Sequence, residues 1–339
     1  MSNCILCGSP GESLYEGLDD VLFGAPGTWS FKRCANSRCQ LIWLDPQPLE
    51  EDIGKAYATY YTHQDSAGGS SLPKRIYRQV RASYLRSRLG YETTSTSRAW
   101  RWLAPLGHLH PGGAGVFAAM VMFLPAPRST STLLDVGCGG GDFIAMMREL
   151  GWTVAGVETD PIAAARAQSR GLNVHQGALQ TAAFEEKTFD AITIAHVVEH
   201  VHDPQGMLAQ CRRILNPQGT IVITTPNSAS WGHRHYGRDW RGLEPPRHLH
   251  LFNRQNMRRL LEWTELRPRV VETLALNTSA IWPASAAIRR SRSSAASTRW
   301  RVGLATTASG VGRQLAERLM LNVDRSAGED LVAIATRPA

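Results

Sequence analysis

Residues 133–143 read Leu-Leu-Asp-Val-Gly-Cys-Gly-Gly-Gly-Asp-Phe, an apolar run that ends in a carboxylate and continues into a cluster of glycines. This pattern predicts a buried parallel strand that turns sharply into a helix. Glycine has no Cβ atom and adopts positive φ readily, so glycines at 137, 139 and 141 would let the backbone lie against a ligand at the N-terminus of that helix. The stretch therefore predicts a site for a bulky, flat-lying ligand.

Two ligand classes fit a glycine-rich turn of this kind. The dinucleotide fingerprint G-x-G-x-x-G requires a third glycine where this chain has Asp142. The spacing D-x-G-x-G-x-G, which opens at Asp135, instead resembles motif I of the class I S-adenosylmethionine (SAM) methyltransferases. A second strand, expected at 153–158, ends in Glu158 about 20 residues after the glycines, the usual position of a ribose-binding carboxylate. The resemblance implies adenosyl binding by six residues, which are Asp135, Gly137, Gly139, Gly141, Glu158 and His196.

Strands and helices alternate along the rest of this region, which predicts a doubly wound parallel α/β sheet. The resemblance implies the Rossmann-like, seven-stranded sheet of the SAM methyltransferases. Helices are expected at 143–150 and 161–170, and a further helix capped by Asn253 is expected to run through Trp263. A turn is expected at 216–219. The strands that follow the first are expected at 153–158, 172–176, 189–195, 220–225, 269–276 and 330–336.

Four of the six cysteines lie near the N-terminus, as a C-x2-C pair (Cys4, Cys7) and a C-x4-C pair (Cys34, Cys39). Two such pairs, brought together by a hairpin, can supply the four thiolates that tetrahedral zinc requires. The second spacing is longer than the common C-x2-C, and four free thiols are the alternative. We expect structural zinc, and we expect packing roles for the two other cysteines, Cys138 and Cys211.

Three regions are expected: a zinc ribbon at 1–45, a helical linker or cap at 46–128, and a SAM-binding methyltransferase domain at 129–339. The ribbon, a P-x-P turn and a Y-x-x-Y-Y patch together resemble a bacterial group of methyltransferases. The tyrosines of the patch would cover the cofactor or form the apolar side of a helix, and they are Tyr57, Tyr60 and Tyr61. An insertion at 280–327 is expected to form a helical hairpin, with Leu315, Leu319 and Val323 spaced along one side.

The expected fourth strand is followed by the segment His196-Val197-Val198-Glu199-His200. This segment matches the H-x-x-E-H pattern of a zinc-peptidase helix, but it stands at a strand end, where many methyltransferases carry H-V-x-E-H. Some ubiquinone-pathway O-methyltransferases bind a divalent ion here, so a metal at Glu199 and His200 is one alternative. In the others, His200 points at the transferred methyl group or is hydrogen-bonded below it.

A second histidine segment, Pro-Pro-Arg-His-Leu-His-Leu-Phe at 245–252, also matches the bacterial group. Consecutive prolines predict an extended chain, which would place His248 and His250 on one side. Sugar C-methyltransferases with a similar layout carry Tyr and Glu where this chain has Pro245 and Arg247, so O-methylation is favoured. As the base that accepts the proton we rank His248 first, His250 second and His200 third. The alternative is that both loop histidines only satisfy backbone groups.

The formal charge of +8 is concentrated in two segments, 74–101 and 281–325. Two solvated helix faces would explain this, and so would a docking surface for an anionic acceptor or a membrane interface. The N-terminus has no secretory pattern, and the longest apolar run, 114–124, is too short to span a bilayer. We therefore expect a cytoplasmic protein.

Together these features predict a SAM-dependent methyltransferase that acts on an oxygen of a small-molecule, sugar or nucleotide-linked sugar acceptor. RNA or DNA methylation is an alternative, prompted by the ribbon and the arginines. Against it, no N-P-P-Y follows the fourth strand, and no proline precedes Cys211. A non-catalytic SAM-binding scaffold is the third hypothesis.

Overall fold

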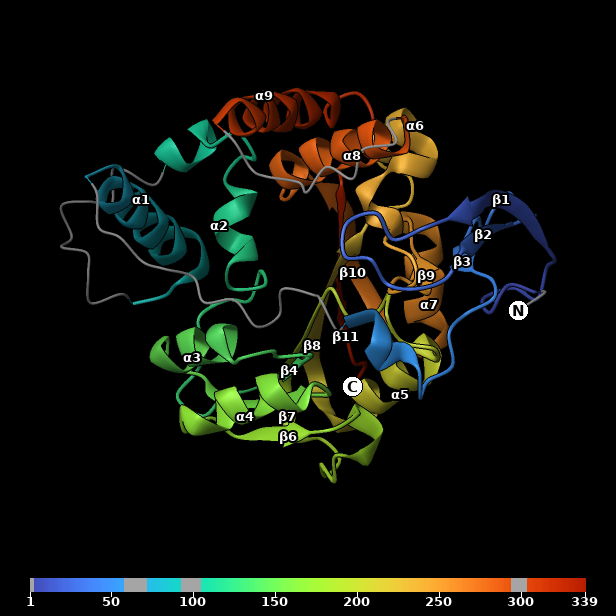
Figure 1. Cartoon of the computed structure of the whole chain (residues 1–339). Coiled ribbons are helices and arrows are strands. Elements are labelled where there is room, and N and C mark those ends of the chain that lie inside the picture. The colour runs from blue at the N-terminus through green and yellow to red at the C-terminus, as the bar shows by residue number, and fades with distance from the viewer. Residues whose placement is uncertain (1–2, 58–71, 93–104, 294–303) are drawn as a thin grey trace. The chain divides into compact units, whose positions relative to one another are not determined.

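The computed structural model describes residues 3–57, 72–92, 105–293 and 304–339 (Figure 1). The chain forms two compact units. Unit 1 comprises Met1–Tyr60, His196–Leu208 and Ile223–Ala335, and unit 2 comprises Tyr61–Ala195, Ala209–Val222 and Thr336–Ala339. The division into three regions made from the sequence stays a prediction.

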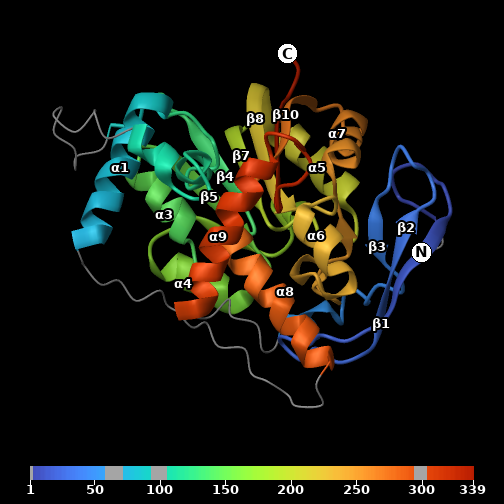
Figure 2. The ribbon, with the colours of Figure 1, turned by 90° about the horizontal axis from the view of Figure 1, so that it is seen from above.

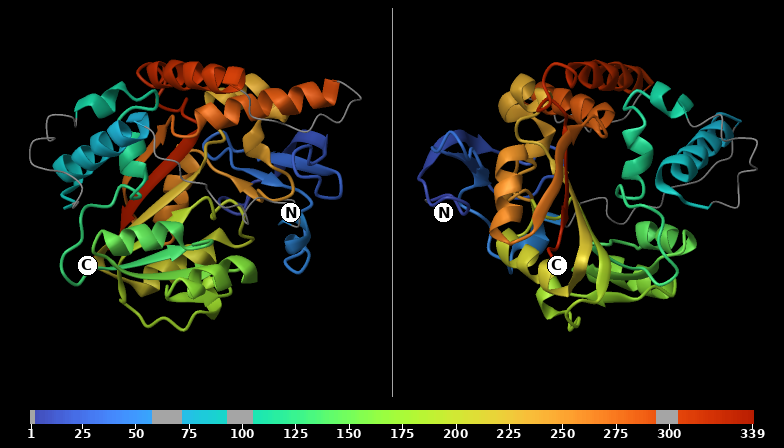
Figure 3. Two further views of the ribbon diagram at one scale, coloured as in Figure 1. Left: turned by 60° about the vertical axis from the view of Figure 1, so that its left-hand side comes forward. Right: turned by 180° about the vertical axis from the view of Figure 1, so that it is seen from behind.

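The described residues contain a seven-stranded sheet in the order β10-β11-β8-β7-β4-β5-β6. Green, yellow, orange and red arrows in Figure 3 belong to this sheet, which combines strands from the middle and the end of the chain. All seven strands expected from the sequence are present, and the predicted doubly wound α/β fold is confirmed. The strands are β4 (Thr132–Val136), β5 (Thr153–Glu158), β6 (Val174–Gln176), β7 (Phe189–Ala195), β8 (Leu215–Pro226), β10 (Arg267–Leu274) and β11 (Asp330–Thr336).

In unit 2 the parallel pairing of β4 and β5 places the glycine turn, which follows β4, beside Glu158, which ends β5. Strand β4 pairs in parallel with both β5 and β7, and Asp135 lies opposite Gly156 and Thr193. Helix α3 (Asp142–Glu149) follows β4, and α4 (Pro161–Ser169) follows β5, both within one residue of the predicted bounds. Helix α4 begins where the Asp160 side chain accepts hydrogen bonds from the N–H groups of Ile162 and Ala163. The remaining helices with residues in unit 2 are α1 (Leu72–Leu89), α2 (Gly115–Ala119) and α5 (Pro204–Ile214).

The turn predicted at 216–219 is wrong, because this stretch belongs to strand β8. The N–H of Gln218 donates to the carbonyl oxygen of Arg337 at 3.1 Å, and the N–H of Arg337 donates to that of Gly219, also at 3.1 Å. Backbone partners distant in sequence thus extend the strand through residues whose local preference favours a turn.

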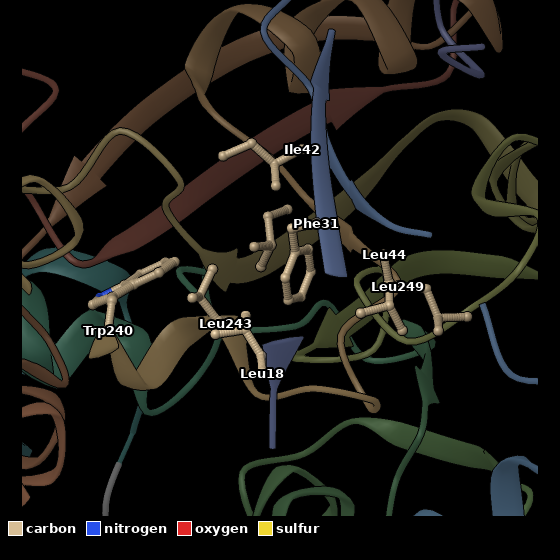
Figure 4. Close-up of a cluster of buried hydrophobic side chains, with 8 residues drawn as sticks. Leu18, Phe31, Ile42, Leu44, Trp240, Leu243 and Leu249 are labelled. Atoms are coloured by element: carbon tan, nitrogen blue, oxygen red, sulfur yellow. The ribbon is translucent and has the colours of Figure 1, made fainter. Parts of the chain in front are cut away.

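In unit 1 the N-terminal hairpin and the second histidine segment share one sheet. Strands β1 (Gly11–Leu18), β2 (Trp29–Cys34), β3 (Ile42–Leu44) and β9 (His250–Leu251) lie in that order, and Trp43 is opposite His250. Their side chains pack into a cluster with residues of the loop before β9 (Figure 4). The cluster consists of Leu18, Phe31, Ile42, Leu44, Trp240, Leu243, Leu249 and Leu251, all buried. The strands next to the four cysteines therefore help to position the second histidine segment.

The helices of unit 1 include the two expected in the insertion. Helix α7 (Arg254–Trp263) begins with a reciprocal capping box between Asn253 and Asn256, and α6 (Trp231–Tyr236) is shorter. Helices α8 (Thr278–Ser293) and α9 (Leu304–Met320) lie alongside each other (Figures 1 and 2). Among the described residues, no helix is both long and apolar enough to cross a membrane.

Candidate functional site

The glycine turn of unit 2 has the backbone conformation that its sequence predicts. Gly137, Gly139 and Gly141 have φ values of 77°, 53° and 80°. The space next to Gly139 is open, since no atom lies within 4 Å of the position a Cβ would occupy. A Cβ on Gly141 would lie 2.4 Å from Cδ1 of Leu172. Gly139 therefore leaves room for a ligand, whereas Gly141 allows the turn to pack against its own unit.

Glu158, at the end of β5, is held directly beside this turn. Its Oε2 accepts a hydrogen bond from the N–H of Gly139 at 2.7 Å, and its Oε1 accepts one from the N–H of Asp160 at 2.8 Å. A carboxylate oxygen has a further lone pair, so each can also accept a bond from a ligand hydroxyl. Two oxygens fixed at one edge of a glycine turn suit a vicinal diol such as that of ribose.

Asp135 lies beneath the turn. It is 5% exposed, and the hydroxyl of Thr193 donates to its Oδ1 at 2.6 Å. Burial, with a smaller contribution from the charge of Glu158, raises the pKa of Asp135 to about 7. The structure thus places Asp135 near the end of β4, with its side chain against Thr193 of β7. Cys138 and Cys211 are buried, as expected of packing residues.

Unit 1 contains a cluster of Glu199, His200 and His248, whose potential ligand atoms lie within 4.8 Å of one another. Glu199 is fully buried, and within the described residues neither of its carboxylate oxygens accepts a hydrogen bond. A third histidine is next to the carboxylate, since Nδ1 of His196 lies 3.3 Å from Oε1 of Glu199. Burial opposes ionisation of Glu199, but the three nearby histidines outweigh it and lower the pKa to about 2.

The two histidines of this cluster are both anchored through Nδ1. Nδ1 of His200 lies 2.9 Å from the carbonyl oxygen of Arg247. Nδ1 of His248 lies 2.7 Å from the carbonyl oxygen of Gly242. A carbonyl oxygen can only accept, so Nδ1 carries the proton and Nε2 keeps a lone pair. Burial lowers the pKa of His248 to about 4, and its ring is therefore neutral at pH 7. The hydroxyl of Tyr57 lies 3.0 Å from Nδ1 of His200, whereas Tyr60 and Tyr61 fall outside the described residues.

The structure does not bring His250 into the cluster. This side chain is fully buried, with Nδ1 3.2 Å from the carbonyl oxygen of Val201 and Nε2 3.3 Å from Nε2 of Gln47. The extended chain predicted after the prolines is wrong. The N–H groups of Arg247 and His248 both donate to the carbonyl oxygen of Glu244, at 2.9 and 3.2 Å, and close a turn there.

A buried ion network stabilises the turn at 244–248. This network was not predicted from the sequence. Arg247 is fully buried and donates to Glu244 Oε1 at 3.0 Å, to Asp20 Oδ2 at 2.8 Å and to the Ala56 carbonyl oxygen at 2.8 Å. Arg241 also pairs with Glu244, whose other carboxylate oxygen lies 3.5 Å from Nε2 of His248. The sequence carried one signal of this network, since an acid and an arginine stand on either side of the two prolines. A buried charge requires a nearby counter-charge, so such a pair can indicate a buried ion pair.

The four N-terminal cysteines converge in unit 1. Sγ of Cys4 lies 3.7 Å from that of Cys39, Sγ of Cys7 lies 3.4 Å from that of Cys34, and all four are within 4.8 Å of one another. Tetrahedral zinc with Zn–S bonds of about 2.3 Å separates its sulfur ligands by about 3.8 Å. Gly8, with φ of 71°, forms the turn after Cys7. The sulfur positions fit structural zinc.

Comparison with known proteins identifies the central part of the chain. Residues 114–269 match the model of a methyltransferase domain family. The chain is 35% identical over 130 residues to a ubiquinone biosynthesis O-methyltransferase of Xanthomonas campestris pv. campestris strain B100, covering 36% of this chain and 52% of that protein. It is 38% identical over 107 residues to the protein of that name from Actinobacillus pleuropneumoniae serotype 5b, covering 28% and 45%.

The chain spans about half the length of these curated relatives. Among solved structures, an S-adenosylmethionine-dependent methyltransferase from Mesorhizobium loti is 18% identical with a TM-score of 0.45, over 67% of this chain and all of that one.

Proposed function

We propose that this chain transfers a methyl group from SAM to an oxygen atom of a small-molecule acceptor. The observation that carries the proposal is the pairing of Glu158 with the open glycine turn inside a region that matches a methyltransferase domain. The names of the relatives support transfer to oxygen. Sugar or nucleotide-linked sugar acceptors stay in the proposal as the classes favoured by the sequence.

SAM would be held in unit 2 by the backbone around Gly139 and by Glu158. The two carboxylate oxygens would accept hydrogen bonds from the ribose hydroxyls while keeping the N–H groups that already orient them. Bound there, SAM supplies a methyl group on a positively charged sulfur. Transfer to the acceptor oxygen would leave a neutral thioether, so the residues of this chain would need mainly to position the acceptor against that methyl group.

In unit 1 we propose that the acceptor hydroxyl gives its proton to Nε2 of His248 or His200. Both rings are fixed through Nδ1 and present a lone pair at Nε2. The ionised carboxylate of Glu199 lies beside them and would stabilise the imidazolium that forms. His248 keeps the first rank, whereas His250 loses its second rank because its ring nitrogens face Val201 and Gln47.

The same three side chains also fit a divalent metal ion. The Nε2 atoms of His200 and His248 would be two ligands, with their Nδ1–H groups anchored on carbonyl oxygens as metal-binding histidines usually are. Glu199 would be the third, and its buried oxygens accept no hydrogen bond within the described residues. A bound metal would polarise the acceptor oxygen. The four N-terminal cysteines would hold a separate, structural zinc.

The proposal is tested by incubating the full chain with methyl-labelled SAM and three acceptor pools: phenolic compounds, nucleotide-linked sugars and total RNA. We expect label in one small-molecule pool together with release of S-adenosylhomocysteine. Label in RNA that is suppressed by salt would favour the nucleic-acid hypothesis instead. SAM binding without transfer to any pool would favour the scaffold.

A further inference from the structure

Helix α9 carries a stripe of apolar side chains that is open to solvent. Val311, Leu315, Leu319 and Val323 are spaced four residues apart, so the stripe runs along one side of the helix and into the turn after it. Their exposed fractions are 40, 47, 61 and 88%. Single exposed leucines are common on protein surfaces, but an aligned row of four marks a surface for interaction.

The other side of α9 is the one that packs within unit 1. Gln314 is buried and donates to the carbonyl oxygens of Ala275 and Leu276, at 2.7 and 2.9 Å. Glu317 is fully buried and accepts a hydrogen bond from the hydroxyl of Thr278, on α8, at 3.0 Å. Helices α8 and α9 run alongside each other (Figure 2). The side chains of α9 that make these contacts are buried and polar, whereas those of the apolar stripe are exposed.

The charges that border the stripe are positive. Arg325 is exposed and Arg318 is partly exposed. Arg313 does not border the stripe, because its guanidinium lies over the ring of Trp282, on α8. The two acids nearby contribute little, because Glu317 is buried and Asp324 forms an ion pair with Arg234 at 2.8 Å. An apolar stripe with arginines beside it has the composition of helices that lie in the interface of an anionic membrane.

We propose that the stripe on α9 docks onto the surface of an anionic lipid bilayer. The leucine and valine side chains would enter the boundary between headgroups and acyl chains, and the arginines would meet lipid phosphates. Pairing with α9 of a second copy fits less well, since the bordering side chains on both partners would be arginines. The stripe shares no residue with the glycine turn or with the histidine cluster.

Vesicle flotation tests the proposal on the full chain. We expect it to float with vesicles of phosphatidylcholine containing about 30% phosphatidylglycerol, much less with pure phosphatidylcholine, and less at high salt. Replacing Leu315 and Leu319 together by Gln should lower binding about tenfold or more. The matched control replaces Leu49 and Trp263, which are 61 and 55% exposed, by Gln and should bind like the wild type. Arg325→Gln should lower binding about fivefold.

Circular dichroism establishes that each variant is folded. Equal loss in the Leu49/Trp263 control, or no preference for the anionic vesicles, overturns the proposal. So does an absence of flotation. If the wild type does not float but sediments as a dimer that Leu315→Gln/Leu319→Gln converts to a monomer, a second copy covers the stripe instead.

Discussion

The imidazole rings of His200 and His248 meet edge to face, with their centroids 4.7 Å apart. One ring belongs to the H-V-V-E-H segment and the other to the P-P-R-H-L-H-L-F segment. The carbonyl oxygen of Glu199 accepts hydrogen bonds from the N–H groups of Leu249 and His250, at 2.7 and 3.2 Å, so backbone contacts also join the two segments. Motifs that the sequence suggested independently therefore form one cluster.

Removing either ring should impair the chemical step. A general base contributes about 100- to 10,000-fold, so His248→Ala and His200→Ala should each lower turnover at least about 100-fold while SAM affinity is kept. His235→Ala, an exposed histidine of unit 1, is the control. Turnover and SAM affinity are measured by S-adenosylhomocysteine release and calorimetry. Near-normal turnover in His248→Ala would show that the first-ranked base is wrong.

The pH profile and chelation distinguish a base from a metal site. Because burial lowers the pKa of His248 to about 4, the base is neutral above that pH, and turnover should be level from about pH 5 upward. A solvent-exposed histidine would instead give a rising limb near pH 6.5. Turnover should also survive removal of Mg²⁺ and Mn²⁺ by a chelator treatment mild enough to leave the zinc of the four cysteines bound. Loss of turnover on chelation, with recovery on adding Mg²⁺ or Mn²⁺, would assign the cluster to a metal.

Glu158 should determine SAM affinity. Glu158→Ala leaves two ribose hydroxyls without acceptors at a cost of about 1–3 kcal/mol, which weakens binding about 5- to 150-fold. Glu149→Ala removes an exposed acid from α3 in the same unit and should bind SAM normally. Calorimetry on both variants gives the comparison. Equal affinities would place the cofactor elsewhere.

Local patterns predicted the parts of the fold that depend on nearby residues. Strand β7 occupies Phe189–Ala195 as predicted, because a mostly apolar run suits a strand buried within the sheet. Helix α7 begins after Asn253 as predicted, because its side chain accepts from the N–H groups of Gln255 and Asn256. Both signals lie within a few residues of the element that they define.

The turn before His248 could not be predicted in the same way. Its shape depends on Arg247, and the acceptors of Arg247 include Asp20 and Ala56, far away in sequence. The pairing of β9 with β3 is also distant in sequence. Glu244 and Arg247 flank the two prolines, but their sequence does not show that they are buried or that Asp20 joins them. Local rules alone therefore predict an extended chain after the two prolines.

Zinc should be bound by the four N-terminal cysteines. Metal analysis should give about one zinc per chain, and Cys7→Ser should release it. Because β1–β3 share a hydrophobic cluster with Trp240 and Leu249, zinc loss should also lower turnover by loosening the segment that carries His248. Cys211→Ala, at a buried cysteine of α5, should keep its zinc. A native protein without metal and with four reactive thiols would contradict the assignment.

Two buried acids of unit 1, Glu317 and Glu329, should make the stability of the protein depend on pH. The N–H of Glu329 donates to Oε1 of Glu317 at 2.8 Å, and both side chains are almost entirely buried. Burial raises the pKa of Glu317 to about 9 and that of Glu329 to about 7, and the charge of Glu329 raises that of Glu317 further. Both values exceed the ordinary value of about 4.3, so the folded state binds more protons than the unfolded state.

Stability from this pair is complete below about pH 4 and is lost as the pH rises through about 7 and then about 9. Unfolding by urea, followed by tryptophan fluorescence, should report it, since Trp282 Nε1 donates to Glu317 at 3.3 Å and Trp240 Nε1 to Glu329 at 2.9 Å. Between pH 6 and pH 9 the wild type should lose about 5 kcal/mol of its free energy of unfolding, most of it from Glu317. Glu317→Gln should lose much less, because the amide does not ionise, whereas the surface control Glu262→Gln should behave like the wild type. A stability that rises over this range, or an equal loss in Glu317→Gln, would show that the pair is ionised in the folded protein.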